Sequence, residues 1–235
     1  MLVYRGDRPQ TTPFGVGETL EYGGTYRLLV APIGMGKVAT LSVVAIDTID
    51  GVAAWKFSFL TDISIPFYHN HSALTSWTTV GTFVSRRFDR RVEETGYARH
   101  DDFGIFADSG FYRVAGDTAS HRTPREPLDD VAFFYYIRLS TTPLEVGKTY
   151  RIDRYFRDDR NPAVISVLRR EPCDLPQGVK ARCLVLNPVV DDPPHGMFMK
   201  SNNAELWVTD DSRRIPVRIK SGAYTLDIRK ITLAR

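Results

Sequence analysis

Apolar and polar residues alternate most regularly near the C-terminus of the chain. The run 204–208 places its apolar residues on one side of an extended segment, and similar alternation recurs over 215–219 and 224–228. Successive side chains of a β-strand point to opposite faces, and turn-forming residues separate the runs. The pattern therefore predicts a three-stranded antiparallel meander with one buried face. Pro216 has no backbone N–H to donate, which predicts an edge strand or a bulge at its position.

Weaker alternation, interrupted by turn signals, continues through most of the chain. It predicts about ten to thirteen strands in total, those before the meander spanning 19–30, 37–46, 53–61, 82–88, 90–99, 104–106, 149–156, 162–173 and 179–190. Residues 33–36 carry two glycines and are expected to form a hairpin turn. The segments 62–80 and 116–127 are expected to be irregular, the first as a long loop or a short helix. The aromatic-rich run 129–139 is the best helix candidate.

These elements favour a mainly β fold built on a single large antiparallel sheet, curled into a barrel or half-barrel, with one candidate covering helix. Residues 1–12 are expected to be an N-terminal arm, and 13–235 a single β-rich domain. The chain has 235 residues, 43% of them hydrophobic and 11% aromatic. That composition is typical of a globular protein, and the aromatic residues favour strands.

The net charge of +3 requires neither nucleic acid nor an anionic surface as a partner. No recognised nucleic-acid-binding module is present. No stretch reaches the roughly 18–20 apolar residues of a transmembrane helix, and the N-terminus lacks the apolar region of a secretory signal. If Met1 is the true start, we expect the cytoplasm or the cytoplasmic face of a membrane. If an export signal has been omitted, we expect the periplasm or cell envelope.

Two cysteines, Cys173 and Cys183, flank a segment with turn chemistry at 176–178. A hairpin turn there would place them opposite each other, within reach of a disulfide. Two reduced buried thiols are the alternative, and the redox state of the compartment decides between them. The spacing excludes a CxxC motif.

Candidate catalytic chemistry is sparse. His69 and His71 share one face of an extended chain, a spacing that suits a metal, but the sequence identifies no third ligand. The paired aspartates fall at turns, where aspartate is locally favoured. Phosphate-binding loops and nucleophile elbows are missing from the sequence. We therefore predict no catalytic residue, no cofactor and no enzymatic activity.

Two other groups of residues suggest binding. The densest basic run could form an interaction patch with arginines near the C-terminus, the full set being Arg86, Arg87, Arg90, Arg91, Arg213 and Arg214. Aromatic residues are abundant and would either fill the core or line an apolar cavity on the concave side of a half-barrel. A solvated strand face and a filled core are the plainer interpretations of these two groups.

Several motifs resemble the bacterial domain of unknown function DUF3108, in the same order and over roughly 13–233. They include PFGVGETLEY, PIGMGKVATLSV, PLEVGKTY and ELWVTDDSRRIPVRI. The most specific pattern is carried by Trp207, Asp211, Arg214, Pro216 and Val217. The resemblance implies a strongly curved antiparallel sheet, similar to the half-barrels of bacterial lipoprotein carriers, in exported envelope proteins. It brings no catalytic residues, so the motif residues are expected to be structural.

The sequence therefore favours a non-enzymatic binding or scaffold protein, an extrinsic subunit that docks on a larger assembly, which could be a membrane complex. The segments 62–80 and 116–127 are the expected contact regions. One alternative is a carrier of an apolar or lipid-like ligand in the concave face. A second is a metal-dependent enzyme that uses His69 and His71.

Overall fold

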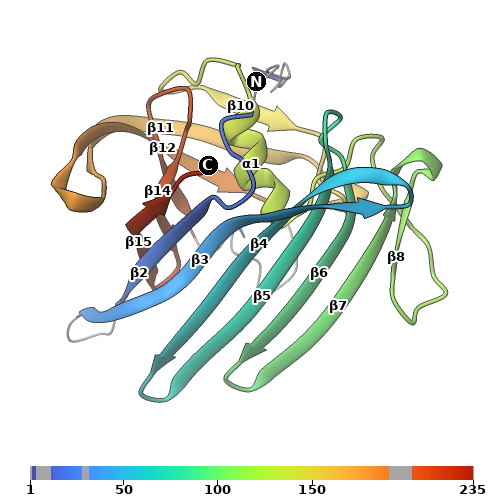
Figure 1. The fold of residues 1–235 in the computed structure, drawn as a ribbon, viewed down its shortest axis with the longest axis horizontal. Helices are drawn as coiled ribbons and strands as arrows, with labels where there is room; N and C mark the ends of the chain where they lie inside the picture. Colours follow the sequence, from blue (N-terminus) through green and yellow to red (C-terminus); the bar gives the residue numbers. More distant parts are fainter. Residues whose placement is uncertain (1, 4–11, 28–31, 191–202, 235) are drawn as a thin grey trace.

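The computed structural model describes residues 2–3, 12–27, 32–190 and 203–234, which form a curved β-sheet around one helix (Figure 1). The helix is α1 (Asp130–Leu139), and short 3₁₀ turns lie at Ala107–Ser109, Asp158–Arg160 and Pro176–Gly178. The described strands are β1 (Leu2–Val3), β2 (Thr19–Arg27), β3 (Pro32–Ile49), β4 (Val52–Ile65), β5 (Tyr68–Thr79), β6 (Ser85–Glu94), β7 (Tyr97–Phe106), β8 (Phe111–Val114), β9 (His121–Arg122), β10 (Thr149–Ile152), β11 (Ala163–Asp174), β12 (Lys180–Val189), β13 (Glu205–Thr209), β14 (Pro216–Ser221) and β15 (Tyr224–Thr232).

All these strands belong to one sheet, in the order β1-β10-β11-β12-β13-β14-β15-β2-β3-β4-β5-β6-β7-β8-β9. Neighbouring strands pair antiparallel except β1 and β10, which are parallel. β1 and β9 are edges that do not pair with each other, so the sheet is not closed. The predicted fold class, a mainly β protein with one large curved antiparallel sheet and one helix, is confirmed.

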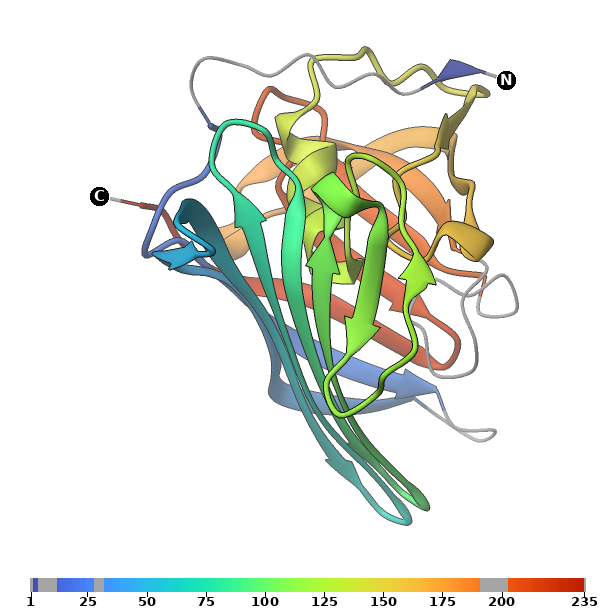
Figure 2. The ribbon, with the colours of Figure 1, turned by 90° about the vertical axis from the view of Figure 1, so that its right-hand side faces the viewer.

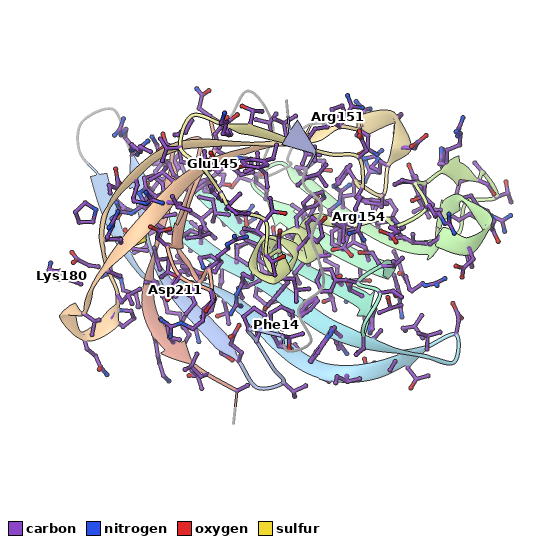
Figure 3. All side chains as sticks on the ribbon, turned by 90° about the horizontal axis from the view of Figure 1, so that it is seen from above. Phe14, Glu145, Arg151, Arg154, Lys180 and Asp211 are labelled. Atoms are coloured by element: carbon purple, nitrogen blue, oxygen red, sulfur yellow. A yellow bond between two sulfur atoms is a disulfide. The ribbon has the colours of Figure 1, made fainter. Side chains whose placement is uncertain are left out.

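Helix α1 lies inside the curve of the sheet. Its aromatic run is apolar on every side, a composition that requires burial all round, and every residue from 131 to 138 is buried. Tyr135 stacks on Phe57 of β4 at 3.8 Å, and Phe14 packs edge-on against both rings. Figure 3 looks along the helix and shows Phe14 beside it. Asp129 caps the helix by accepting bonds from the N–H groups of Val131 and Ala132. The helix predicted at 129–139 is confirmed.

The C-terminal meander is confirmed as β13, β14 and β15. Pro216 pairs with Val208 where the register between β13 and β14 shifts, so the predicted bulge is present in an interior strand. The hairpin turn predicted at 33–36 is wrong, because these residues belong to β3. The strand predicted at 90–99 is also wrong. It contains the turn between β6 and β7, with Gly96 at a φ of 79°.

The irregular segment predicted at 62–80 is wrong as well, because these residues form the end of β4, a tight turn and the whole of β5. The inward positions there carry polar side chains in place of apolar ones, which obscured the alternation. Asn70 accepts hydrogen bonds from Thr61 at 2.8 Å and Ser72 at 3.0 Å, so these groups satisfy each other inside the curve.

Smaller differences concern short strands that the sequence pattern did not predict. Part of the expected N-terminal arm, Leu2–Val3, forms β1, and part of the expected loop at 116–127 forms β9. The described strands number fifteen, more than the ten to thirteen predicted, because several are only two to four residues long. The β4–β5 and β6–β7 hairpins extend well beyond α1, as Figure 2 shows, and end at the side of the molecule opposite to its top loops.

Candidate functional site

Two surfaces stand out, and they lie at opposite ends of the molecule. The first is a groove of about 660 Å³ at the C-terminal end of α1, which we call the α1-end groove. It runs between the loop after α1 and the β13–β14 turn. Its apolar residues include Pro13, Leu139, Pro143, Leu144 and Leu184. A pocket for a small molecule or a side chain typically measures about 300–1,000 Å³, so the groove is large enough to hold one.

A buried ion pair fixes the inner wall of this groove. The side chain of Arg138, at the end of α1, is 0% exposed, and that of Glu18, just before β2, is 2% exposed. Arg138 donates to Glu18 Oε2 at 3.0 Å and to the carbonyls of Pro13 and Arg213, each at 3.1 Å. A buried guanidinium is tolerated only when its donors are satisfied. The pair therefore joins the N-terminal segment, the helix and the β13–β14 turn.

Two of the motif residues expected to be structural, Asp211 and Arg214, lie at the same end of the helix. Arg214 donates to the carbonyls of Ile137 at 3.1 Å and Thr142 at 2.7 Å, and so satisfies part of the helix C-terminus. Asp211 accepts from the backbone N–H groups of Arg213 and Arg214 and holds the turn. Figure 3 shows Asp211 to one side of α1.

Trp207 and Pro216 act nearby on the sheet itself. The Trp207 indole donates to Glu171 at 2.6 Å, between the guanidiniums of Arg169 and Arg218. The carbonyl of Pro216 accepts from the buried Tyr22 hydroxyl at 2.9 Å. These contacts all support the packing of the sheet, and none presents a reactive group.

Positive charge exceeds negative charge along the α1-end groove. Arg170 pairs with Asp210 at 2.6 Å and Arg213 with Asp211 at 2.8 Å, while Arg214 is held by carbonyl oxygens. Among the described residues that line the groove, together with the Glu18 partner of Arg138, four arginines face three carboxylates. Partial burial acts to raise the pKa of Asp211, but hydrogen bonds from Arg213 and Thr209 outweigh it, and the net pKa is lowered.

The second surface is the tip of the β4–β5 hairpin, residues 65–68, which we call the hairpin tip. Phe67 is 101% exposed and has a φ of 66°. The left-handed region is unusual for a bulky residue, where glycine or asparagine is favoured. Two backbone N–H bonds join the neighbouring turns, from His69 to the Thr95 hydroxyl at 2.9 Å and from Thr95 to the His69 carbonyl at 3.1 Å. These bonds brace the backbone of the tip, from which the Phe67 side chain projects into solvent.

Tyrosines line the inner side of the same hairpin. Tyr68 stacks on Tyr26 at 6.0 Å and approaches Tyr224 at 5.7 Å, and it donates to Glu94 at 2.7 Å. Burial, followed by hydrogen bonds with Tyr224 and Glu94, raises the pKa of Tyr68. Burial also raises the pKa of Tyr224 to about 12. With their pKa values raised, the Tyr68 and Tyr224 hydroxyls stay protonated at neutral pH, so they serve as hydrogen-bonding groups and not as bases.

Farther along the inner face, Asp101 lies between Arg90 at 2.8 Å and Arg99 at 2.7 Å. Its side chain is 5% exposed. Burial acts to raise the pKa of Asp101, but the hydrogen bonds and charges of the two arginines outweigh it, so the pKa is lowered. The trio is a satisfied ionic network that stabilises the inner face of β6 and β7.

The predicted metal candidates lie elsewhere. His69 and His71 occupy outward positions of β5, where His71 is 3.8 Å from Asp62 and His69 contacts Thr95. Within the described residues, no three His, Cys, Asp or Glu side chains gather closely enough to hold a metal. The structure therefore does not bring a third ligand to this pair.

The predicted arginine patch is not gathered into one surface. Arg87 and Arg91 point outward from β6 and pair with Asp102 and Asp89, whereas Arg90 points inward. Arg86 pairs with Asp108 at 2.6 Å near the 3₁₀ turn after β7. Arg213 and Arg214 lie at the α1-end groove, at the other end of the molecule. Each of these arginines has a partner within the chain, and the six are divided among four locations.

Cys173 and Cys183 form a disulfide between β11 and β12, with their Cα atoms 5.8 Å apart. The sequence predicted that the two cysteines lie directly opposite each other, and this register is wrong. Cys173 pairs with Ala181 and Cys183 with Glu171, so the bridge runs diagonally across the ladder.

Among the described residues, no helix has the length and apolar content needed to cross a membrane.

Sequence reasoning missed Glu18, Arg138 and Phe67. Glu18 and Arg138 are separated by 120 residues, and only the fold brings them together. A charged residue inside the otherwise apolar run 131–139 was the available signal for Arg138. The signal for Phe67 was Pro66 before it, which favours a turn.

Comparison with known proteins agrees with the resemblance seen in the sequence. The model of DUF3108, a protein family of unknown function, matches residues 21–229. The comparison with curated proteins found no match. Among solved structures, a β-barrel-like protein of the domain of unknown function DUF1849 from Brucella abortus is similar, with a TM-score of 0.56 and 9% sequence identity over 94% of this chain and 99% of that chain. At that identity the likeness concerns the fold alone. Because the family model covers most of the chain, the protein belongs to the DUF3108 family.

Proposed function

We propose that this protein is a non-catalytic binding protein that docks on a protein partner through the hairpin tip. The observation that carries the proposal is Phe67, which is fully exposed at a position where its backbone is strained. A large apolar side chain there stabilises neither the core nor the turn. Aromatic side chains of this kind serve as anchors in protein interfaces, where one or two of them supply most of the binding energy.

The rigidity of the tip supports this role. β4 and β5 pair without a register shift from Ala54–Thr79 to Ile65–Tyr68. The contacts between His69 and Thr95 join the tip to the next hairpin. A braced backbone on either side of the anchor reduces the conformational entropy that the hairpin loses on binding. This arrangement favours docking of a preformed hairpin over folding of a flexible loop upon binding.

The alternative of an apolar ligand carrier has less support. Helix α1 and Phe14 occupy the concave side of the sheet beside β4. The cavity between α1, β11 and β12 measures about 10 Å³, roughly the space of one water molecule. An acyl chain or sterol would have to displace the helix to enter there.

Site-specific photo-crosslinking tests the proposal. A photoreactive phenylalanine analogue would replace Phe67 in the full chain, expressed in native cells. The matched control places the same analogue at Leu60, which is 46% exposed on the outer face of the same hairpin. We expect a discrete covalent adduct from position 67 that is absent or much weaker from position 60. Equal adducts from both positions, or none from position 67, would refute docking through the tip.

A further inference from the structure

The hairpin tip and the α1-end groove have complementary properties. The ends of the two long hairpins, residues 62–71 and 93–98, contain Asp62, Glu93 and Glu94 but no lysine or arginine. The Asp62 side chain is 80% exposed. The tip therefore presents the apolar Phe67 side chain next to acidic side chains. Such a surface is repelled by anionic lipid headgroups and attracted to an apolar pocket with a positive rim.

The α1-end groove has that character. Leu139, Pro143 and Leu144 contribute apolar surface, and arginines exceed aspartates around it. Arg170 and Arg213 remain partly exposed, at 40% and 47% of their side chains, while each pairs with an aspartate. The groove volume of about 660 Å³ is sufficient for the Phe67 ring and the adjacent Pro66.

The two surfaces lie at opposite ends of the molecule. The β4–β5 turn is at the bottom of Figures 1 and 2, whereas the C-terminal end of α1 and the loop after it are at the top. A molecule cannot fill its own groove with its own tip across this distance. We propose that the hairpin tip of one molecule docks in the α1-end groove of a second copy. This inference rests on the proposed function, because it uses the same tip.

The contact joins two different surfaces, so it is a head-to-tail contact and does not close on itself after two copies. It extends into chains of molecules unless the rotation between copies closes a ring. A hairpin tip in a groove buries less than a standard interface of about 1,600 Å², so we expect weak association that depends on concentration. Opposite charges on the two surfaces predict weaker association as salt is raised.

Complementary variants give a decisive test by sedimentation velocity on the purified full chain. Phe67→Asn removes the anchor, and asparagine tolerates a positive φ. Thr141→Trp obstructs the groove from an exposed loop position and leaves its ion pairs intact. Ser212→Trp, at another exposed position of the groove, is the second blocking variant in case the first does not fold. Leu60→Asn is the control for loss of an exposed apolar side chain from the hairpin.

We expect the wild type and Leu60→Asn to form species larger than a dimer as concentration rises to about 1 mM, a range that weak interfaces require. Each disabled variant alone should associate at least about tenfold more weakly. An equimolar mixture of Phe67→Asn and Thr141→Trp should form dimers and nothing larger, because each partner retains one working surface.

A wild type that stays monomeric, a mixture that stays monomeric, or a disabled variant that associates like the wild type would overturn self-docking. The crosslinking experiment separates this failure from failure of the proposed function. An adduct from position 67 with another protein, in the absence of self-association, would leave the tip as a docking element and exclude the second copy as its partner.

Discussion

Replacing Arg138 by methionine should destabilise the protein more than almost any other single change. The substitution leaves Glu18 buried and charged, with its side chain 2% exposed, and removes the donors to the carbonyls of Pro13 and Arg213. Removing one partner of a buried ion pair typically costs about 3–5 kcal/mol. For a chain of this size, each kcal/mol lowers the melting temperature by about 2–4 °C, so we expect a fall of about 6–20 °C.

The assays are thermal unfolding, which gives the melting temperature, and urea unfolding, which gives the free energy, both at pH 7 and both followed by tryptophan fluorescence and circular dichroism. Lys180→Met is the matched control, because Lys180 pairs with Asp174 at a site where both side chains are more than 60% exposed. We expect that control to remain within about 0.5 kcal/mol of the wild type. If Arg138→Met loses no more stability than Lys180→Met, the buried ion pair between Arg138 and Glu18 does not stabilise the protein as argued.

A double variant separates the cost of the unpaired Glu18 charge from the cost of the lost hydrogen bonds to the carbonyls. Arg138→Met combined with Glu18→Leu removes the stranded charge but still leaves the carbonyls of Pro13 and Arg213 without their donor. We expect it to recover about 2 kcal/mol or more relative to Arg138→Met alone. It should not reach the wild type, because these part-buried carbonyls lose their donor, at a cost of up to about 1–3 kcal/mol each. Full recovery would mean that the carbonyl bonds contribute nothing.

Three further changes have defined outcomes. Arg90 and Arg99 lower the folded-state pKa of Asp101 below its usual value of 3.8, so the stability that the ionised carboxylate provides is fully present above that pH and is lost as the pH falls further. In acid titrations, the difference in the free energy of unfolding between the wild type and Asp101→Asn should therefore narrow below about pH 4 and not above it. Phe67→Asn should raise the free energy of unfolding by up to about 1–2 kcal/mol, because it relieves the positive φ without loss of core; a destabilised variant in the same urea assay would contradict this. Reducing the bridge between Cys173 and Cys183, which closes a loop with a sequence separation of 10, should cost about 2–3 kcal/mol; unchanged urea midpoints with and without reductant would exclude that contribution.

The sequence pattern correctly predicted the elements that can be recognised from the hydrophobic pattern of their own residues. The meander at 204–228 follows from alternation, and the helix at 129–139 follows from its aromatic-rich run. The pattern failed at 62–80 because inward residues such as Asn70 and Ser72 are polar and satisfy each other. Hydropathy cannot distinguish such a strand from a loop, since both are rich in polar side chains.

The predicted arginine patch failed for a reason that the sequence did contain. In the run 86–91, a strand directs alternate residues to opposite faces, so Arg90 cannot share a surface with Arg87 and Arg91. The two-residue period of a strand separates charged residues in the same way as apolar ones, so the sequence already places Arg90 on the opposite face. The aspartate partners on β7 required the strand register, which the sequence alone does not determine.

The family pattern acquires a physical meaning from its position. Asp211 and Arg214 fix the β13–β14 turn against the C-terminal end of α1, and Arg138 approaches that turn from the helix. The same residues border the α1-end groove. A substitution such as Arg214→Ala would therefore loosen the helix end and change the groove together, so loss of binding in that variant alone could not identify a contact residue. Blocking substitutions at Thr141 or Ser212, which add bulk without removing these bonds, separate the binding role of the groove from its structural role.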